Sequence, residues 1–478
     1  MVFTSFEFII FFLSLSIFYF SISIKFRWKL LLISSLFFYG LIKPIFILIL
    51  LFISITIYLG SILFEKIHFE KYKFYSFIII LLITIAPLLF FKYFNSINQY
   101  ILTFFERAPS KNILNNSWLI LPIGISYYTF MAVGYITDVY NEKIKAEKNL
   151  FMVMLFISFF PLVMSGPIER AEKMFDQFRN KLFFDYKKVI YGFQMILWGM
   201  FLKLVLADNL SLFLNPIFEN INYSSGKTIL LAISLYPFQI YGDLGGYSLL
   251  AIGFSSILGV HVRINFKRPF FSTSMSNFWR RWHISLISWI TDYIYTPITF
   301  FLRKNGLFGI ILSLLLTFLI AGLWHDATLP FVIWGLIQGF VLSLEAITKS
   351  SRLKIFNKNS LNNNIFFKVC CSILVYFIFS FSLIFGGPFE SLNECLFVIE
   401  KIFLNNDSFS HSKIELLKLI ILILLVLFLE FKQEYYPEKL KLFRNKNLLI
   451  RWISYLSIIL FIVLLGVFSN DNFIYFQF

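Results

Sequence analysis

The chain has 478 residues, of which 59% are hydrophobic and only 14% are charged. Soluble domains carry about 25% charged residues, so this composition excludes a soluble globular protein. The formal net charge of +16 is expected mainly in cytoplasmic loops and against anionic lipid headgroups, so we predict membrane lipids and no nucleic acid as partners.

Apolar stretches recur along the whole chain at the length of about 20 residues that crosses a hydrocarbon core. We therefore expect an all-α, polytopic integral membrane protein with about 11–13 transmembrane helices plus re-entrant or interfacial helices. The first stretch, 5–24, lacks a basic start and a small-residue cleavage site, which favours a retained helix over a signal peptide. The stretch 30–64 is either one helix kinked at Pro44 or two helices, and the choice reverses the membrane side of every later loop.

Polar residues are unevenly distributed, and they divide a single membrane-embedded domain into three parts. Residues 1–117 consist of plain hydrophobic segments and are predicted to be scaffold helices. In 118–345 the apolar runs are interrupted by Gly, Pro, Arg, Asp and His, and 346–478 returns to plain hydrophobic helices. Because irregular backbone at membrane depth survives only inside protein or beside water, the central part is predicted to be the functional core.

The stretch NFWRRWHISLISWITDYIYTP, residues 277–297, is too polar for a helix that faces lipid. As a single helix it would place Trp282 and Trp289 on one face, at the headgroup level where tryptophan is enriched. Arg280, Arg281 and His283 make it either a surface-lying amphipathic anchor or the wall of a functional site.

A second polar stretch is GLWHDATLPFVIWGLIQG, residues 322–339. Ionisable residues within membrane spans usually face a cavity or a partner, so His325 is a functional candidate. Of the remaining histidines, His68 and His411 lie in connectors, and His261 lies beside a basic run. Histidine has an ordinary pKa of about 6.5 and suits general-base chemistry. Metal sites need about three or four ligands, and no compact cluster follows, so no metal is expected.

GDLGGY at 242–247 does not have the spacing of a phosphate-binding loop. Its glycines predict close helix packing or a bend instead. Asp208, Asn209 and Asp243 are polar residues of the same core, which we interpret first as structural hydrogen-bonding groups.

Together these segments resemble the membrane-bound O-acyltransferase family, and most of all the bacterial branch that contains the membrane subunit of alginate O-acetyltransferase. The resemblance is an ordered series over about 118–340: LPIGISYYTFMAVGYITDVY, FFPLVMSGPIERAEKMFDQF, KLVLADNL, YGDLGGYSLLAIGFSSILGV, NFKRPFFSTSMSNFWRRWHISLISWITDYIYTP and GLWHDATLPFVIWGLIQG. His325 matches the family's principal catalytic histidine and His283 its second invariant histidine. The family usually has glycine directly after its principal catalytic histidine, where this chain has Asp326 after His325.

The resemblance implies an O-acyltransferase, and specifically an O-acetyltransferase, in the bacterial inner membrane. The expected donor is acetyl-CoA or another acyl thioester, with no bound cofactor, and the expected acceptor is a hydroxyl of an extracytoplasmic polysaccharide. A periplasmic or membrane-anchored acetyltransferase partner is a further expectation. Since no soluble catalytic domain is present, the substrates are expected to meet in a central tunnel. Substrate-binding residues are predicted beside the histidines and in GDLGGY: Trp279, Arg280, Arg281, Trp282, Trp324, Asp326 and Asp243.

Two other classes of protein fit part of the sequence. A transporter or flippase for a glycan or lipid-linked sugar would also have about a dozen spans and broken central helices, but no repeat of the 265–339 pattern is found. A noncatalytic scaffold of a polymer-export complex explains the hydrophobicity but not the paired histidines. For each arginine of WRRWH, a simple interfacial position with the charge in the headgroup layer is the alternative to donor binding.

Overall fold

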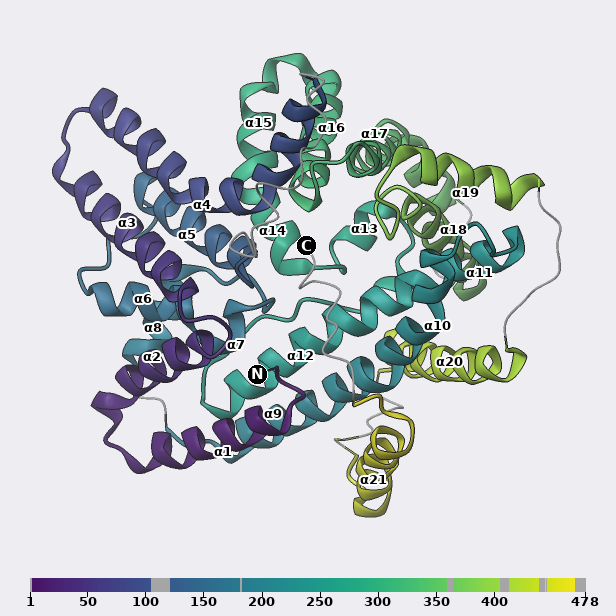
Figure 1. Cartoon of the computed structure of the whole chain (residues 1–478), viewed down its shortest axis with the longest axis horizontal. Helices are drawn as coiled ribbons and strands as arrows, with labels where there is room; N and C mark the ends of the chain where they lie inside the picture. The colour runs from purple at the N-terminus through teal and green to yellow at the C-terminus, as the bar shows by residue number, and fades with distance from the viewer. Residues whose placement is uncertain are drawn as a thin grey trace. The chain divides into compact units, whose positions relative to one another are not determined.

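The computed structural model describes residues 2–104, 121–180, 183–358, 364–404, 412–437, 443 and 445–468. Regular structure in these ranges is helical throughout (Figure 1). The all-α prediction is therefore confirmed. His411 lies outside the described residues.

Packing of the chain divides it into two compact units. Unit 1 comprises Met1–Met195 and Leu250–Arg263, and unit 2 comprises Ile196–Leu249 and Ile264–Phe478. The boundaries of these units differ from the three parts marked by polar residues, whose functional meaning stays a prediction.

Unit 1 contains long apolar helices followed by short ones. Its elements are α1 (Phe6–Ser21), α2 (Ile24–Gly40), α3 (Phe46–Lys66), α4 (Glu70–Phe104), α5 (Ile125–Tyr140), α6 (Leu150–Ser158), α7 (Phe160–Val163), α8 (Ala171–Arg179), and parts of α9 (Tyr186–Met200) and α12 (Gly246–Ile257). Helices α3, α4 and α5 pack against one another (Figure 1). Pro44 lies between α2 and α3, so the stretch 30–64 forms two helices; proline lacks the N–H that a continuous helix needs there.

Unit 2 contains the breaker-rich segments. After the end of α9 it continues with η1 (Phe201–Ala207), α10 (Asp208–Glu219), α11 (Gly226–Ile240), η2 (Tyr241–Gly245), the start of α12, η3 (Pro269–Phe271), α13 (Met275–Trp279), α14 (Ile284–Ile290), η4 (Thr291–Tyr295), α15 (Thr296–Phe301), η5 (Arg303–Asn305), α16 (Gly306–His325), α17 (Leu329–Lys358), α18 (Ile365–Ser382), α19 (Leu392–Leu404), α20 (Lys413–Tyr435) and α21 (Leu448–Leu465). Of these, η1, η2 and η4 are π-helical. Such segments are rare and occur frequently at functional sites.

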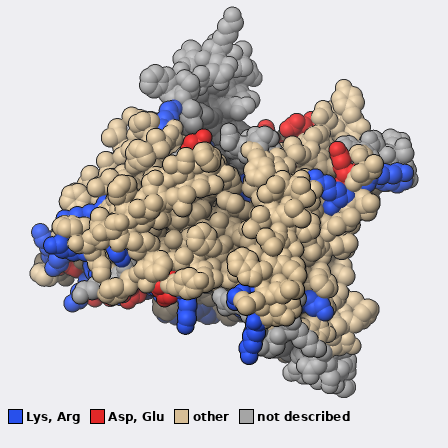
Figure 2. Space-filling model, turned by 90° about the horizontal axis from the view of Figure 1, so that it is seen from below, with Lys and Arg blue, Asp and Glu red and all other residues tan. Residues whose placement is uncertain are grey.

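Within the described residues, 7 helical stretches are long and apolar enough to cross a membrane: Phe46–Lys66, Glu70–Phe94, Tyr186–Glu219, Arg303–His325, Leu329–Arg352, Ile365–Ser382 and Leu448–Leu465. The apolar helix Phe6–Ser21 is shorter. Broad surface areas carry no charged side chains (Figure 2), as expected for helices in contact with lipid. The multi-span prediction is confirmed, whereas the total of about 11–13 spans stays a prediction.

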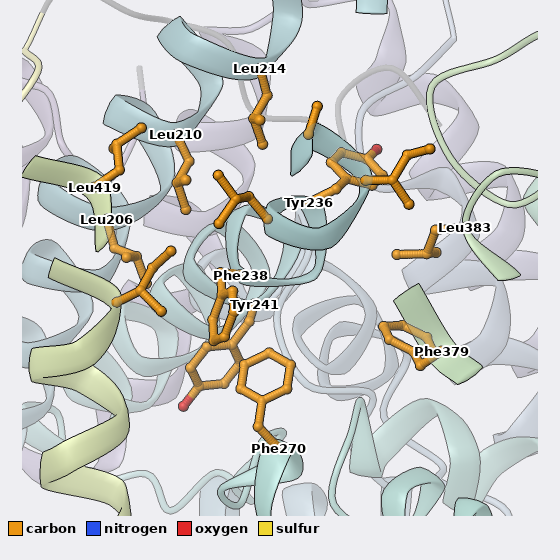
Figure 3. Close-up of a cluster of buried hydrophobic side chains, with 14 of the residues drawn as sticks. Leu206, Leu210, Leu214, Tyr236, Phe238, Tyr241, Phe270, Phe379, Leu383 and Leu419 are labelled. Atoms are coloured by element: carbon orange, nitrogen blue, oxygen red, sulfur yellow. The ribbon is translucent and has the colours of Figure 1, made fainter. Parts of the chain in front are cut away.

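The core of unit 2 is built largely from aromatic and branched side chains. The ring of Phe270 lies 4.6 Å from that of Phe238 and 5.3 Å from that of Tyr241, measured between centroids (Figure 3). Phe379 and Leu383 of α18 and its C-terminal turn, and Leu419 of α20, belong to the same cluster. This core holds the C-terminal helices against the segments that carry the polar motifs of the sequence.

Candidate functional site

The WRRWH segment is not one helix, which corrects the sequence prediction. Helix α13 ends at Trp279, and α14 begins only at Ile284. Between them His283 adopts the left-handed conformation, with φ 45° and ψ 50°. That region is uncommon outside glycine, although histidine enters it more readily than most residues. A non-glycine residue held there costs about 1–3 kcal/mol and persists only where its surroundings determine it.

The tryptophans of this segment are buried in protein, whereas their predicted position at the headgroup level stays a prediction. Trp279 is 7% exposed, Trp282 5% and Trp289 5%. The ring of Trp282 stacks on Phe278 at 5.3 Å and lies 5.1 Å from Phe379. Large aromatic rings that pack on one another contribute strongly to the stability of a protein core.

His283 itself is 3% exposed and lies outside the seven candidate spans. Burial lowers the pKa of His283 to about 4, because a low-dielectric environment disfavours the imidazolium. The side chain is therefore a neutral imidazole at pH 7. In that form it can accept one hydrogen bond and donate another.

His325 is the last residue of α16 and is half-buried. Its ring lies 5.2 Å from that of Trp334, 5.9 Å from Phe331 and 4.5 Å from Trp324. The residue thus lies at the turn between α16 and α17, enclosed by aromatic rings from both sides of the turn.

Helix α17 connects the two histidine segments within unit 2. Trp334, which contacts His325, also lies 6.1 Å from the ring of Trp279. The indole N–H of Trp279 donates to Gln338 Oε1 at 3.3 Å.

The same helix also fixes the start of α13. Glu345 accepts hydrogen bonds from the backbone N–H groups of Met275 and Ser276 at 2.6 and 3.0 Å and so caps the start of α13. Rings and hydrogen bonds from one helix therefore set the position of both motifs.

The two arginines of WRRWH have different surroundings. Arg281 Nη1 donates to Glu434 Oε1 at 2.9 Å, and Glu434 also binds Arg268. Arg280 is exposed, and no ion pair of this residue occurs among the described residues. Arg280 is thus the more available of the two for an anionic ligand, while Arg281 is already paired with a carboxylate that it shares with Arg268.

Asp326, which follows His325, makes a local turn. Its Oδ1 accepts the backbone N–H of Ala327 at 2.8 Å. Its φ is −159°, an extended conformation that any residue adopts. The backbone at this position therefore does not require the glycine that the family usually has.

Sequence reasoning missed a buried ion triad at the π-helical segments. Lys203 Nζ lies 2.5 Å from Asp243 Oδ1 and 2.8 Å from Asp208 Oδ1, and all three side chains are 2–3% exposed. Lys203 in the apolar run FLKLVLA was the available signal, because a buried lysine requires a carboxylate partner. Asp243 was predicted to bind substrate; it contacts Lys203, and substrate binding by it stays a prediction.

The glycines of GDLGGY allow η2 and the start of α12 to approach η1 and the end of α9 closely, as predicted. A Cβ on Gly242 would lie 2.9 Å from the Leu202 carbonyl oxygen, and one on Gly246 would lie 2.9 Å from that of Gly199. The close approach brings Asp243 within reach of Lys203.

Comparison with known proteins places these segments in a family. The membrane-bound O-acyltransferase family matches residues 141–386, just over half of the chain. Similar proteins include the "Probable alginate O-acetylase AlgI" of Pseudomonas putida, 38% identical over 267 residues, which are 55% of this chain and 53% of that protein.

A "Peptidoglycan O-acetyltransferase" of Helicobacter pylori is 30% identical over 342 residues, 66% of this chain and 63% of that protein. A "Teichoic acid D-alanyltransferase" of Bacillus subtilis is 29% identical over 232 residues, 47% of this chain and 59% of that protein. The chain spans about half the length of the first of these relatives. With its helical fold and its apolar spans, the chain is a multi-pass membrane protein that belongs to the membrane-bound O-acyltransferase family.

Proposed function

We propose that this protein is an O-acetyltransferase of the bacterial inner membrane. It takes an acetyl group from a cytoplasmic thioester, acetyl-CoA, and delivers it to a hydroxyl on the other side of the membrane. The acceptor is an extracytoplasmic polysaccharide or a partner protein that modifies one. Relatives whose names are alginate O-acetylase and peptidoglycan O-acetyltransferase support this choice of reaction.

The observation that carries the proposal is the connection of the two histidine segments through α17. His325 contacts Trp334, Trp334 lies beside Trp279, and Trp279 precedes the loop that holds His283. Aromatic walls with few polar groups exclude water and strengthen electrostatic interactions with a reacting group.

In the proposed reaction, the imidazole of His325 removes the proton of the acceptor hydroxyl while the oxygen of that hydroxyl attacks the carbonyl carbon of the thioester. The carbon–sulfur bond then breaks, and the thiolate of CoA takes up the proton from the imidazolium. Neutral His283 orients the donor carbonyl or assists the proton transfer. Exposed Arg280 binds donor phosphates, for which a guanidinium is well suited.

The test is deletion of the gene followed by complementation with the wild type, His325→Ala or His283→Ala, and measurement of ester-linked acetate on surface polysaccharides. A matched control is His261→Ala, since His261 is exposed and its bonds to Gln177 come from its backbone. Loss of a general base lowers a rate by about 10²–10⁴-fold, so the His325 variant should restore almost no acetate. Full acetylation by a stably expressed His325→Ala protein would refute the catalytic role.

A relay through a partner is tested with radiolabelled acetyl-CoA in membrane vesicles. Label on a membrane-associated protein before it reaches the polysaccharide supports the relay. Label that appears on the polysaccharide without such an intermediate, in vesicles from which peripheral proteins have been stripped, supports direct transfer.

A further inference from the structure

Two short segments of unit 2 lie side by side at His283. Lys267 N donates to Arg281 O at 2.9 Å, and Ile284 N donates to Asn265 O at 2.8 Å. The side chain of Asn265 also accepts the N–H of Ser285 at 3.0 Å. Residues 265–268 therefore form a backbone support for residues 281–285.

Each of these segments contains a non-glycine residue in the left-handed conformation. These residues are Arg268, with φ 48°, and His283, with φ 45°. Both conformations are unfavourable in isolation, so they depend on contacts that hold the two segments in place.

Glu434 of α20 supplies a contact that spans both segments. Its Oε2 accepts from Arg268 Nε at 2.6 Å, and its Oε1 accepts from Arg281 Nη1 at 2.9 Å. Glu434 is 16% exposed. Burial opposes its ionisation, but the hydrogen bond from Arg268 and the charge of Arg281 outweigh burial and lower the pKa of Glu434. The carboxylate is therefore ionised at neutral pH.

A carboxylate that binds two arginines through separate oxygens sets the distance between them. Charge-assisted bonds of this kind are short and directional. Without Glu434 the two guanidinium groups would repel each other, and the loop at His283 would keep its bonds to Asn265 but lose its link to α20. Glutamine could not replace it fully, because an amide offers one acceptor oxygen.

We propose that Glu434 is a positioning residue for His283, acting through Arg268 and Arg281 to hold the loop in its left-handed conformation. The inference rests on the proposed acetyl transfer. It assigns a role in the site to α20, which lies outside residues 141–386 matched by the family.

A positioning role differs from a structural one in what its loss changes. The clamp between Glu434 and the two arginines is partly exposed, and such ion pairs contribute little to folding. A small misplacement of a catalytic group, by contrast, costs up to about 10²-fold in rate. Glu434→Ala should therefore lower kcat about 10- to 100-fold, with a KM for acetyl-CoA within about 2-fold of the wild-type value and an almost unchanged unfolding temperature.

The experiment titrates radiolabelled acetyl-CoA on membrane vesicles and measures ester-linked label per folded protein. The variants are Glu434→Ala, Glu434→Gln, Arg268→Ala and the double variant Glu434→Ala with Arg268→Ala. A matched control is Glu415→Gln, an exposed carboxylate in the first turn of the same helix. We expect Glu434→Gln to lie between Glu434→Ala and wild type. The double variant should be no slower than Glu434→Ala, because both changes break the same contact.

Wild-type kcat in Glu434→Ala overturns the inference, as does a loss confined to KM or to the amount of folded protein. If Glu434→Ala does not fold, Glu434→Gln and Arg268→Ala decide by the same criteria. If wild-type protein transfers acetate and His325→Ala does not, but Glu434→Ala matches the wild type, only this inference fails. If the wild-type protein transfers no acetate, both the proposed function and this inference fail.

Discussion

Replacement of Lys203 by methionine is the most direct test of the buried ion triad. Methionine keeps most of the length of the unbranched side chain and removes the charged amino group. It leaves Asp208 and Asp243 buried, at 3% and 2% side-chain exposure, without the ammonium that lies 2.8 and 2.5 Å from them.

The expected cost follows from these distances. With an effective dielectric constant of about 20, each attraction at this range amounts to about 5–7 kcal/mol before the cost of removing the ions from water is subtracted. That cost is several kcal/mol per ion and cancels most of the attraction. Removing one partner, however, forfeits the attraction and keeps the cost for the others, and is typically destabilising by about 3–5 kcal/mol. This loss is a large part of a typical total stability of about 5–15 kcal/mol.

The assay is reversible unfolding in mixed detergent micelles, followed by tryptophan fluorescence. We expect Lys203→Met to lower the free energy of unfolding by about 3–5 kcal/mol. The triple variant with Asp208→Asn and Asp243→Asn should recover most of that loss, since no buried charge remains. The account of the triad would be refuted if Lys203→Met were as stable as the wild type. It would also be refuted if the triple variant had no higher free energy of unfolding than Lys203→Met.

Two further predictions concern positions of the central motifs. Gly242→Ala should destabilise the protein by about 1–3 kcal/mol through overpacking, because the added Cβ would lie 2.9 Å from the Leu202 carbonyl oxygen. Gly245→Ala is the control, because the Cβ added there would lie no closer than 3.4 Å to a neighbouring atom. A tolerated Gly242→Ala in the same unfolding assay would contradict the close packing. Asp326→Asn should keep most acetyl transfer, because an amide oxygen can still accept the N–H of Ala327; a loss of about 10-fold or more in the vesicle assay would assign a role to the charge of Asp326.

Several features of this protein follow from the sequence because they depend on local composition. Long apolar runs must form helices in lipid, since every backbone polar group has to be satisfied within the segment. The two histidine motifs are also continuous in sequence, so each could be identified without knowledge of its partners. The glycines of GDLGGY were recognised as packing residues because small side chains allow close approach wherever helices meet.

Other features depend on residues that are distant in sequence. The prediction of one helix over WRRWH is wrong because hydrogen bonds that Asn265 accepts, and the contact of Arg281 with Glu434, 153 positions away, favour a left-handed His283. A sequence likewise does not reveal that Trp282 packs against Phe379 and Trp279 against Trp334.

The apolar composition and the motif order by themselves determined a helical membrane protein and its candidate histidines. Tertiary structure alone decided which charges meet: Lys203 with Asp243 across 40 positions, and Arg268 with Glu434 across 166. The physical reason is that a charge removed from water needs a partner, while its local sequence carries no information on which distant segment supplies it.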